Sequence, residues 1–291
     1  MSDTPTSTKA RRIKVTALPR RGTRAAESFF ASYSAINRFF HFVLHLVGHT
    51  DQAAETAHQA LVETEPDEAK RQEMIAAWAR RQSATDALRQ NRQLFLEIVL
   101  VRHVENFLNY LGALLYEIFT QRPETLRSSD RIEVASVLRH DSIESLVREI
   151  AERKVESLSY SSFQDLADFF QDRFKISIAD QIPFAALEEA IETRNISVHN
   201  RCVMNRRFVT RLGLEESAVG KRRDLYITHL DSLVPLLATV VRVLDRRAGS
   251  KLRLRGVRFA QSLSTRKANS AMHRTGQPPA APPAAPPAAG R

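Results

Sequence analysis

The segment LFLEIVLVRHVENFLNYLGALLYEIF, from Leu94 to Phe119, constrains the fold more than any other part of the chain. It is apolar on most faces of a helix, and such a helix must lie inside a protein core. The helical pattern continues from Asp67 without Gly or Pro until Gly112, and Arg122-Pro123 ends it. We therefore expect a central core helix here.

Other stretches show the same periodicity, and glycine is scarce, with 9 residues in 291, which favours helices over sheet. The expected helices cover Ala25–Gly48, a second helical stretch to about Glu63, a stretch from Asp67, Asp141–Glu156, one capped by Ser161 or Ser162, one starting near Asp180 or Pro183, and one near the C-terminus with Pro235 as a kink. The fold class is therefore all-α. We expect a disordered basic tail at 1–24, a helical N-terminal extension at 25–89, a helical domain at 90–247, and a disordered tail, basic and then rich in Pro and Ala, at 248–291.

Charge is distributed unevenly along the chain. The formal net charge is +10, but residues 1–24 and 246–291 together carry more than that, so the middle is acidic. Basic ends suit a polyanion such as nucleic acid, or are simply solvated tails. A nucleic-acid binder that works through its tails therefore stays open, although we favour solvated tails.

The compartment follows from the single cysteine, Cys202, which allows no intramolecular disulfide and no multi-cysteine zinc site. A reducing cytoplasm is the simplest interpretation. The stretch Phe29–Gly48 superficially resembles a membrane span, but it contains Arg38, His41 and His45, which are costly within a bilayer. We expect a buried or partner-facing helix there, with no membrane contact and no secretory signal.

A polar switch occurs in the motif RNISVHN, Arg194 to Asn200, which follows the helical run FAALEEAIET. At 3.6 residues per turn, Phe184, Leu187, Ile191 and Val198 form one apolar stripe. Arg194, Asn195 and His199 lie near that stripe in its last two turns. An inward face that turns polar must meet a partner, a cavity or a substrate. Alternatively, Arg194 pairs with Glu105 or another acid, and His199 caps backbone carbonyls.

These residue types suit metal-independent RNA cleavage. A neutral imidazole can accept the proton of a ribose 2′-OH, and a guanidinium can stabilise the charge that develops on the phosphorus. One protomer offers one such histidine, so a general acid for the leaving oxygen would come from a second copy. Nearby basic residues could position phosphates. They are Arg201, Arg206, Arg207 and Arg211.

RNISVHN resembles the signature of HEPN domains, in the form R-N-x3-H-N that is common in prokaryotic members. The core segment, with Glu105 and Phe107, resembles the first long helix of that family, and LSYSSFQDLADFFQDRFKISI resembles the helix before the motif helix. The resemblance covers about residues 90–247.

The resemblance implies an antiparallel helical bundle that forms a homodimer, with both motifs in one cleft. Many members of the family are endoribonucleases of toxin–antitoxin or phage-defence systems and act on RNA without a metal or cofactor. Arg194 and His199 would be catalytic, Asn195 would be the polar residue beside the arginine, and Glu105 an acid that orients them. An antitoxin or defence protein would be a further partner. Other members only bind, so a non-catalytic helical interaction module is the alternative.

The run HFVLHLVGH places His41, His45 and His49 four residues apart on one helix face, and Asp51 follows. Two histidines at this spacing can bind zinc. The competing interpretation is an amphipathic helix with imidazoles on its polar side, and we favour it because no second ligand-bearing helix is identifiable. No metal site is therefore predicted.

Overall fold

The computed structural model of the chain describes residues 18–126, 134–159, 161–178 and 183–259, and helices form nearly all of the regular structure in these ranges. The predicted all-α class is confirmed. Contacts divide the chain into two units, Met1–Arg258 and Phe259–Arg291, and only Phe259 of the second unit lies within the described residues. All helices and strands of the described residues belong to the first unit.

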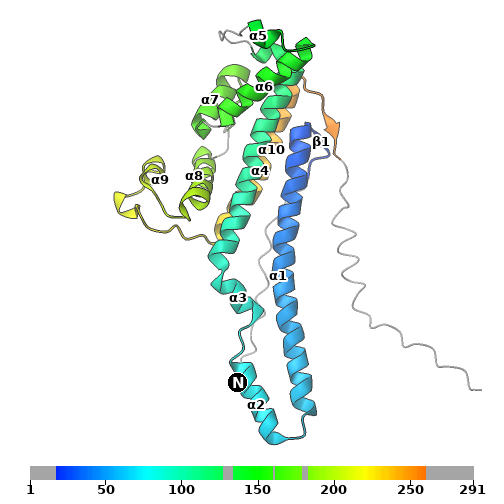
Figure 1. The fold of residues 1–291 in the computed structure, drawn as a ribbon, viewed down its shortest axis with the longest axis vertical. Helices are drawn as coiled ribbons and strands as arrows, with labels where there is room; N and C mark the ends of the chain where they lie inside the picture. The colour runs from blue at the N-terminus through cyan, green and yellow to red at the C-terminus, as the bar shows by residue number, and fades with distance from the viewer. Residues whose placement is uncertain (1–17, 127–133, 160, 179–182, 260–291) are drawn as a thin grey trace, which may run out of the picture. The chain divides into compact units, whose positions relative to one another are not determined.

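The elements follow one another along the chain and are labelled as in Figure 1. They are β1 (Arg21–Gly22), α1 (Arg24–Thr64), α2 (Glu68–Ala79), α3 (Ala84–Gln90), α4 (Arg92–Gln121), the 3-10 turn η1 (Pro123–Leu126), α5 (Val134–Val137), α6 (Ile143–Ser159), α7 (Phe163–Phe174), α8 (Phe184–Asn200), α9 (Arg206–Arg211), the 3-10 turn η2 (Glu216–Ala218), α10 (Ile227–Lys251) and β2 (Val257–Arg258).

Helix α4 is the centre of the core, as its apolar sequence predicts. It contacts α1, α6, α8 and α10, and its residues Leu111, Leu114 and Phe119 are completely buried. Figure 1 shows α4 with α1 along one side and α8 along another. Because α4 is covered by several helices, nearly all of its faces can be apolar.

The predicted helix starts agree with the caps. Asp67 accepts hydrogen bonds from the first turn of α2, and Ser162 forms a capping box with Asp165 at the start of α7. Pro183 precedes α8, whereas the alternative start at Asp180 lies outside the described residues. Two boundaries differ from the prediction: α1 is one continuous helix, and the helical run from Asp67 is divided into α2, α3 and α4.

The N-terminal helical region does more than extend the helical domain. Between Ala25 and Phe40, helix α1 buries Phe29, Phe30 and Tyr33 in the same core as α4. Beyond Phe40 it buries no residue, and it continues as a hairpin with α2, where His58 stacks on Trp78 with 4.4 Å between ring centroids.

The predicted disorder at both ends is only partly compatible with the structure. Arg21 and Gly22 pair antiparallel with Arg258 and Val257, and α10 continues to Lys251, past the expected boundary at 248. The short two-stranded pairing escapes periodicity arguments because two residues carry no alternation. Residues 1–17 and 260–291, with most of the basic and Pro/Ala-rich tails, lie outside the described residues.

The start of α1 is fixed by carboxylates from two other helices. Thr23 caps the helix and also donates from Oγ1 to Asp245 Oδ1 of α10 at 2.5 Å, while its N–H donates to Oδ2 at 3.2 Å. The N–H of Ala25 donates to Glu117 of α4 at 3.2 Å. Burial raises the pKa of both carboxyls. Negative charge at a helix N-terminus is favourable, so these bonds join α1, α4 and α10.

We expect Asp245→Ala to lower the free energy of unfolding by about 1–3 kcal/mol, because it leaves the buried Thr23 hydroxyl and N–H without their acceptor. Urea unfolding followed by circular dichroism measures this. Glu55→Ala, which changes an exposed acid far along α1, is the control and should be neutral. Equal stability of both variants would contradict the role of Asp245.

One helix among the described residues, Ile227–Lys251, is long and apolar enough for a membrane span, with a mean hydropathy of 1.5 in its best window. In that window, 44% of the residues are buried in the protein, as in a core helix. The segment Phe29–Gly48 does not meet the same criterion.

Candidate functional site

Helix α8 carries the RNISVHN motif and ends with it. Its last residue is Asn200, and Arg201 follows in the left-handed conformation at φ 52°, as does Cys202 at φ 62°. The N–H of Cys202 closes the end by donating to Ile196 O at 2.9 Å. Gln93 of α4 lies against Cys202 and bonds the carbonyl of Arg223, which ties this end to the centre of the bundle.

Arg194 lies between α8 and α4 and makes two polar contacts. Its Nη2 donates to Glu105 Oε1 at 3.1 Å, and its Nη1 donates to Asn195 Oδ1 at 3.2 Å. The side chains of Arg194 and Glu105 are 23% and 28% exposed, so the pair is reachable from solvent. Both interpretations of the sequence expected the Arg194–Glu105 pair, so the pair alone does not choose between them.

Arg102 is a member of this cluster that the motif did not indicate. Its Nη1 lies 3.4 Å from Glu105 Oε2, so the carboxylate stands between two guanidinium groups. The i,i+3 spacing of Arg102 and Glu105 on one helix could have indicated the pair. Arg102 is 67% exposed, which leaves its charge available to a phosphate.

The predicted inward stripe of α8 is wrong in its second half. Val198 is 47% exposed and His199 is exposed, whereas Thr193 and Ile196, on another side of the helix, are buried. The side of α8 that contacts the core changes along the helix. A stripe extrapolated from Phe184 therefore faces solvent in the last turns. Arg194, Asn195 and His199 therefore line a surface of the protein.

The four basic residues after the motif do not form one continuous basic surface. Arg211 pairs with Glu192 of α8, whose side chain is only 4% exposed, and Arg206 pairs with Glu216 at 3.1 Å. Arg201 and Arg207 are exposed. Arg211 therefore holds α9 against α8, and the exposed residues that remain available for phosphate are Arg201, Arg206 and Arg207.

Arg211→Ala is expected to lower the free energy of unfolding by about 1–3 kcal/mol, because it leaves the buried Glu192 carboxylate without its cation. Arg207→Ala removes the same charge from an exposed position of the same helix and should change stability by less than about 0.5 kcal/mol. Thermal melts of the two variants separate these roles, and a neutral Arg211→Ala would show that the contact does not hold α9.

Comparison of the chain with protein-family models, curated proteins and solved structures finds no match.

Exposed apolar side chains lie on the two helices that carry the charged cluster. Leu94 and Ile98 of α4 are 55% and 49% exposed, and they precede Arg102 at four-residue spacing, on one face of the helix. Val198 of α8 is exposed as well. Contacts at Arg194–Glu105 and at Cys202–Gln93 show that α8 runs antiparallel to α4, so Val198 lies level with this row. Exposed apolar residues around a polar cluster indicate an interface.

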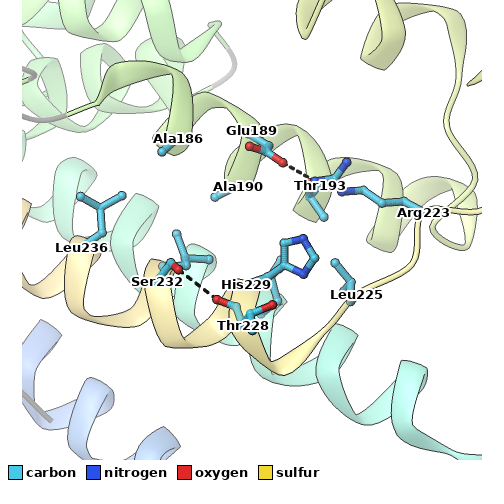
Figure 2. Close-up of a pocket in the computed structure, with 12 residues that line it drawn as sticks. Ala186, Glu189, Ala190, Thr193, Arg223, Leu225, Thr228, His229, Ser232 and Leu236 are labelled. Carbon is cyan, nitrogen blue, oxygen red and sulfur yellow. Dashed lines mark hydrogen bonds and ion pairs between the residues drawn. The ribbon is translucent and has the colours of Figure 1, made fainter. Parts of the chain in front are cut away.

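A cavity of about 290 Å³ lies between α8 and α10, and its lining includes Leu100 of α4. Figure 2 shows the ring of His229 in the middle of this cavity, with Glu189 and Arg223 paired on its rim. The cavity also includes Thr193, which follows Glu192 and precedes the motif arginine. Glu189 and Arg223 pair with each other and His229 Nδ1 accepts from the Tyr226 N–H, so we assign the cavity no reaction.

The histidine run of α1 is exposed in part. His45 and His49 place their Nε2 atoms 3.0 Å apart, while His41 is half-buried and its ring contacts Phe40. Asp51 has a different role, because its carboxylate accepts the N–H groups of Ala84 and Thr85 at the start of α3. Within the described part of the chain, no cluster of three or more His, Cys, Asp or Glu residues is placed to hold a metal.

Proposed function

We propose that the protein is a metal-independent endoribonuclease of HEPN type that acts as a cytoplasmic homodimer, in a toxin or phage-defence role. The observation that carries the proposal is the surface cluster of Arg194, Glu105, Asn195 and Arg102, beside the helix that carries His199 in its last turn. A polyanion can reach these groups, and the cations match a phosphodiester.

The chemistry assigns a different task to each side chain. His199, exposed at the end of α8, accepts the 2′-OH proton as the 2′ oxygen attacks phosphorus. Arg194 stabilises the added negative charge on the phosphorane. Glu105 and Asn195 are positioning residues, because they hold the guanidinium and do not contact the reacting atoms. The bond to the 5′ oxygen then breaks, and that oxygen takes a proton.

The second proton donor explains why two copies are needed. Arg194 and His199 are five residues apart, which separates them by about 140° around the helix and about 7.5 Å along it. One α8 therefore presents the two groups in different directions. Two copies related by a two-fold axis would bring the arginine of one motif toward the histidine of the other and supply two histidines. Leu94, Ile98 and Val198 offer the apolar contact for this pairing.

The test is cleavage of mixed single-stranded and structured RNA by the purified protein with excess EDTA. We expect products with 2′,3′-cyclic phosphate and 5′-hydroxyl ends, because the nucleophile is the ribose hydroxyl. DNA, which lacks that hydroxyl, should not be cut. Activity that disappears with EDTA and returns with magnesium would contradict the proposal.

A non-catalytic helical interaction module is the second candidate. The observation in its favour is that both terminal nitrogens of Arg194 already donate to protein acceptors, Glu105 and Asn195, as those of a structural arginine would. It predicts that wild-type protein cuts no RNA and that Arg194 variants change only stability or assembly.

A further inference from the structure

A row of exposed apolar side chains lies on α1, away from the motif. Phe39, Phe42 and Leu46 are 56%, 57% and 51% exposed, and they succeed one another at spacings of three and four residues. This spacing places them within about 60° of one another on the helix. Three large apolar side chains side by side in solvent mark an interaction surface.

The same stripe continues toward the end of α1 with small residues. Ala53, Ala57 and Ala60 are exposed and lie within the same 60° or so. These alanines are spaced by four and then three residues, the reverse of the order in Phe39, Phe42 and Leu46. Leu46 and Ala53 are equally far from the midpoint between His49 and Thr50. The same holds for Phe42 with Ala57, and for Phe39 with Ala60.

We propose that α1 pairs antiparallel with α1 of a second copy, with the two-fold axis passing near His49 and Thr50. In this arrangement each large residue of one helix faces a small residue of the other, over about 30 Å. Alternation of large and small residues across facing positions is what close helix packing requires.

Charge supports the same occupant. Arg38 and Glu63 are exposed on one flank of the stripe, near its opposite ends. A two-fold axis perpendicular to both helices leaves this flank of the two copies on the same side of the pair. Arg38 of each copy then lies within about one helical turn of Glu63 from the other. A parallel pairing would place this flank of the two copies on opposite sides of the pair, with Arg38 level with Arg38 and far from Glu63 of the other copy.

The core leaves this stripe free. Helices α4, α3 and α2 contact α1 on other sides, as the burial of Tyr33 and Phe40 and the stacking of His58 on Trp78 show. In Figure 1, α2 and α3 lie on the same side of α1 as α4. The surface differs from the motif face on α4 and α8, so this pairing is independent of the proposed ribonuclease.

The geometry is tested on full-length protein with a short bismaleimide cross-linker. Its reach is similar to the distance of about 8–10 Å between the axes of packed helices. Thr50→Cys should cross-link to itself, because the two positions differ by about 1.5 Å along the helices. Leu61→Cys, which is also at an exposed position, should not, because its copies are about 35 Å apart. Wild type, whose Cys202 is buried, is the blank.

Specificity is tested by changing one residue on each surface in the Thr50→Cys background. Phe42→Glu should reduce cross-linking at least tenfold while leaving the melting temperature unchanged, since Phe42 is more than half exposed. Ile75→Glu, on the exposed face of α2, and His199→Ala should both retain it. Absence of the Thr50→Cys product, equal linking through Leu61→Cys, or linking unaffected by Phe42→Glu would each overturn the pairing.

Discussion

His199→Ala protein is expected to lose RNA cleavage by at least about 100-fold in the presence of EDTA, because a positioned general base contributes about 10²–10⁴ to the rate. Arg194→Ala should lose about as much, since it removes the charge that stabilises the phosphorane. Single-turnover cleavage of one labelled RNA measures both. If either variant cuts as fast as wild type, the assignment of that residue is wrong.

Stability measurements on the same variants exclude a trivial loss of fold. His199 is exposed, and Arg194 and Glu105 are each about a quarter exposed, so water screens their attraction. Losing the ion pair should therefore cost about 1 kcal/mol or less. A loss of several kcal/mol in Arg194→Ala, with no RNA cleavage by wild type, would favour the non-catalytic module.

Two further variants separate positioning from binding. Glu105→Gln keeps a hydrogen-bond acceptor but removes the charge that holds Arg194, so it should lower kcat more than it raises KM. Arg207→Ala removes an exposed cation from α9 and should raise KM, with a weaker dependence on salt.

The helices could be predicted from sequence because their signals are local. An apolar stripe, a cap such as Asp67 or Ser162, and a proline such as Pro123 act within a few residues of the chain. The pairing of β1 with β2 could not be predicted, because it joins two-residue segments more than 200 residues apart.

The candidate site shows where periodicity fails. The angular count placed Arg194 on the inward side, where it is only half-buried, although its contact with Glu105 was among the expected ones. It placed Val198 inside, although the core contacts α8 on a different side there. Burial of Glu192 by Arg211 depends on how α9 folds back after the motif, which a helical wheel for α8 cannot contain.

The stability of the protein should fall in mild acid because of His103. This residue of α4 is 1% exposed, packs on Tyr33 with 5.6 Å between ring centroids, and has no hydrogen-bond partner for Nε2 among the described residues. Burial lowers its pKa to about 4. In the unfolded chain the pKa is near the ordinary value of about 6.5.

Proton binding sets the direction of this change. Between these two pKa values the unfolded chain binds a proton that the folded protein does not, so stability is complete above about pH 7 and falls as the pH decreases toward 4. The difference amounts to about 3 kcal/mol in full, and to about 1.4 kcal/mol at about pH 5.5. Burial raises the pKa of Glu117 and Asp245, which therefore change stability in the opposite direction.

Comparison of wild type with His103→Leu cancels the contributions of Glu117 and Asp245 to the pH dependence, because both proteins retain these two groups. Urea unfolding between about pH 8 and 5.5 should show wild type losing about 1.4 kcal/mol more than the variant, whatever their difference at pH 8. Leucine fills the apolar site without a titrating group. Only the change in stability with pH is compared between the two proteins, so the absolute stability of the variant does not affect the result. Parallel pH curves for the two proteins would mean that His103 takes up a proton in the folded state, and that the contact between α1 and α4 tolerates a charge.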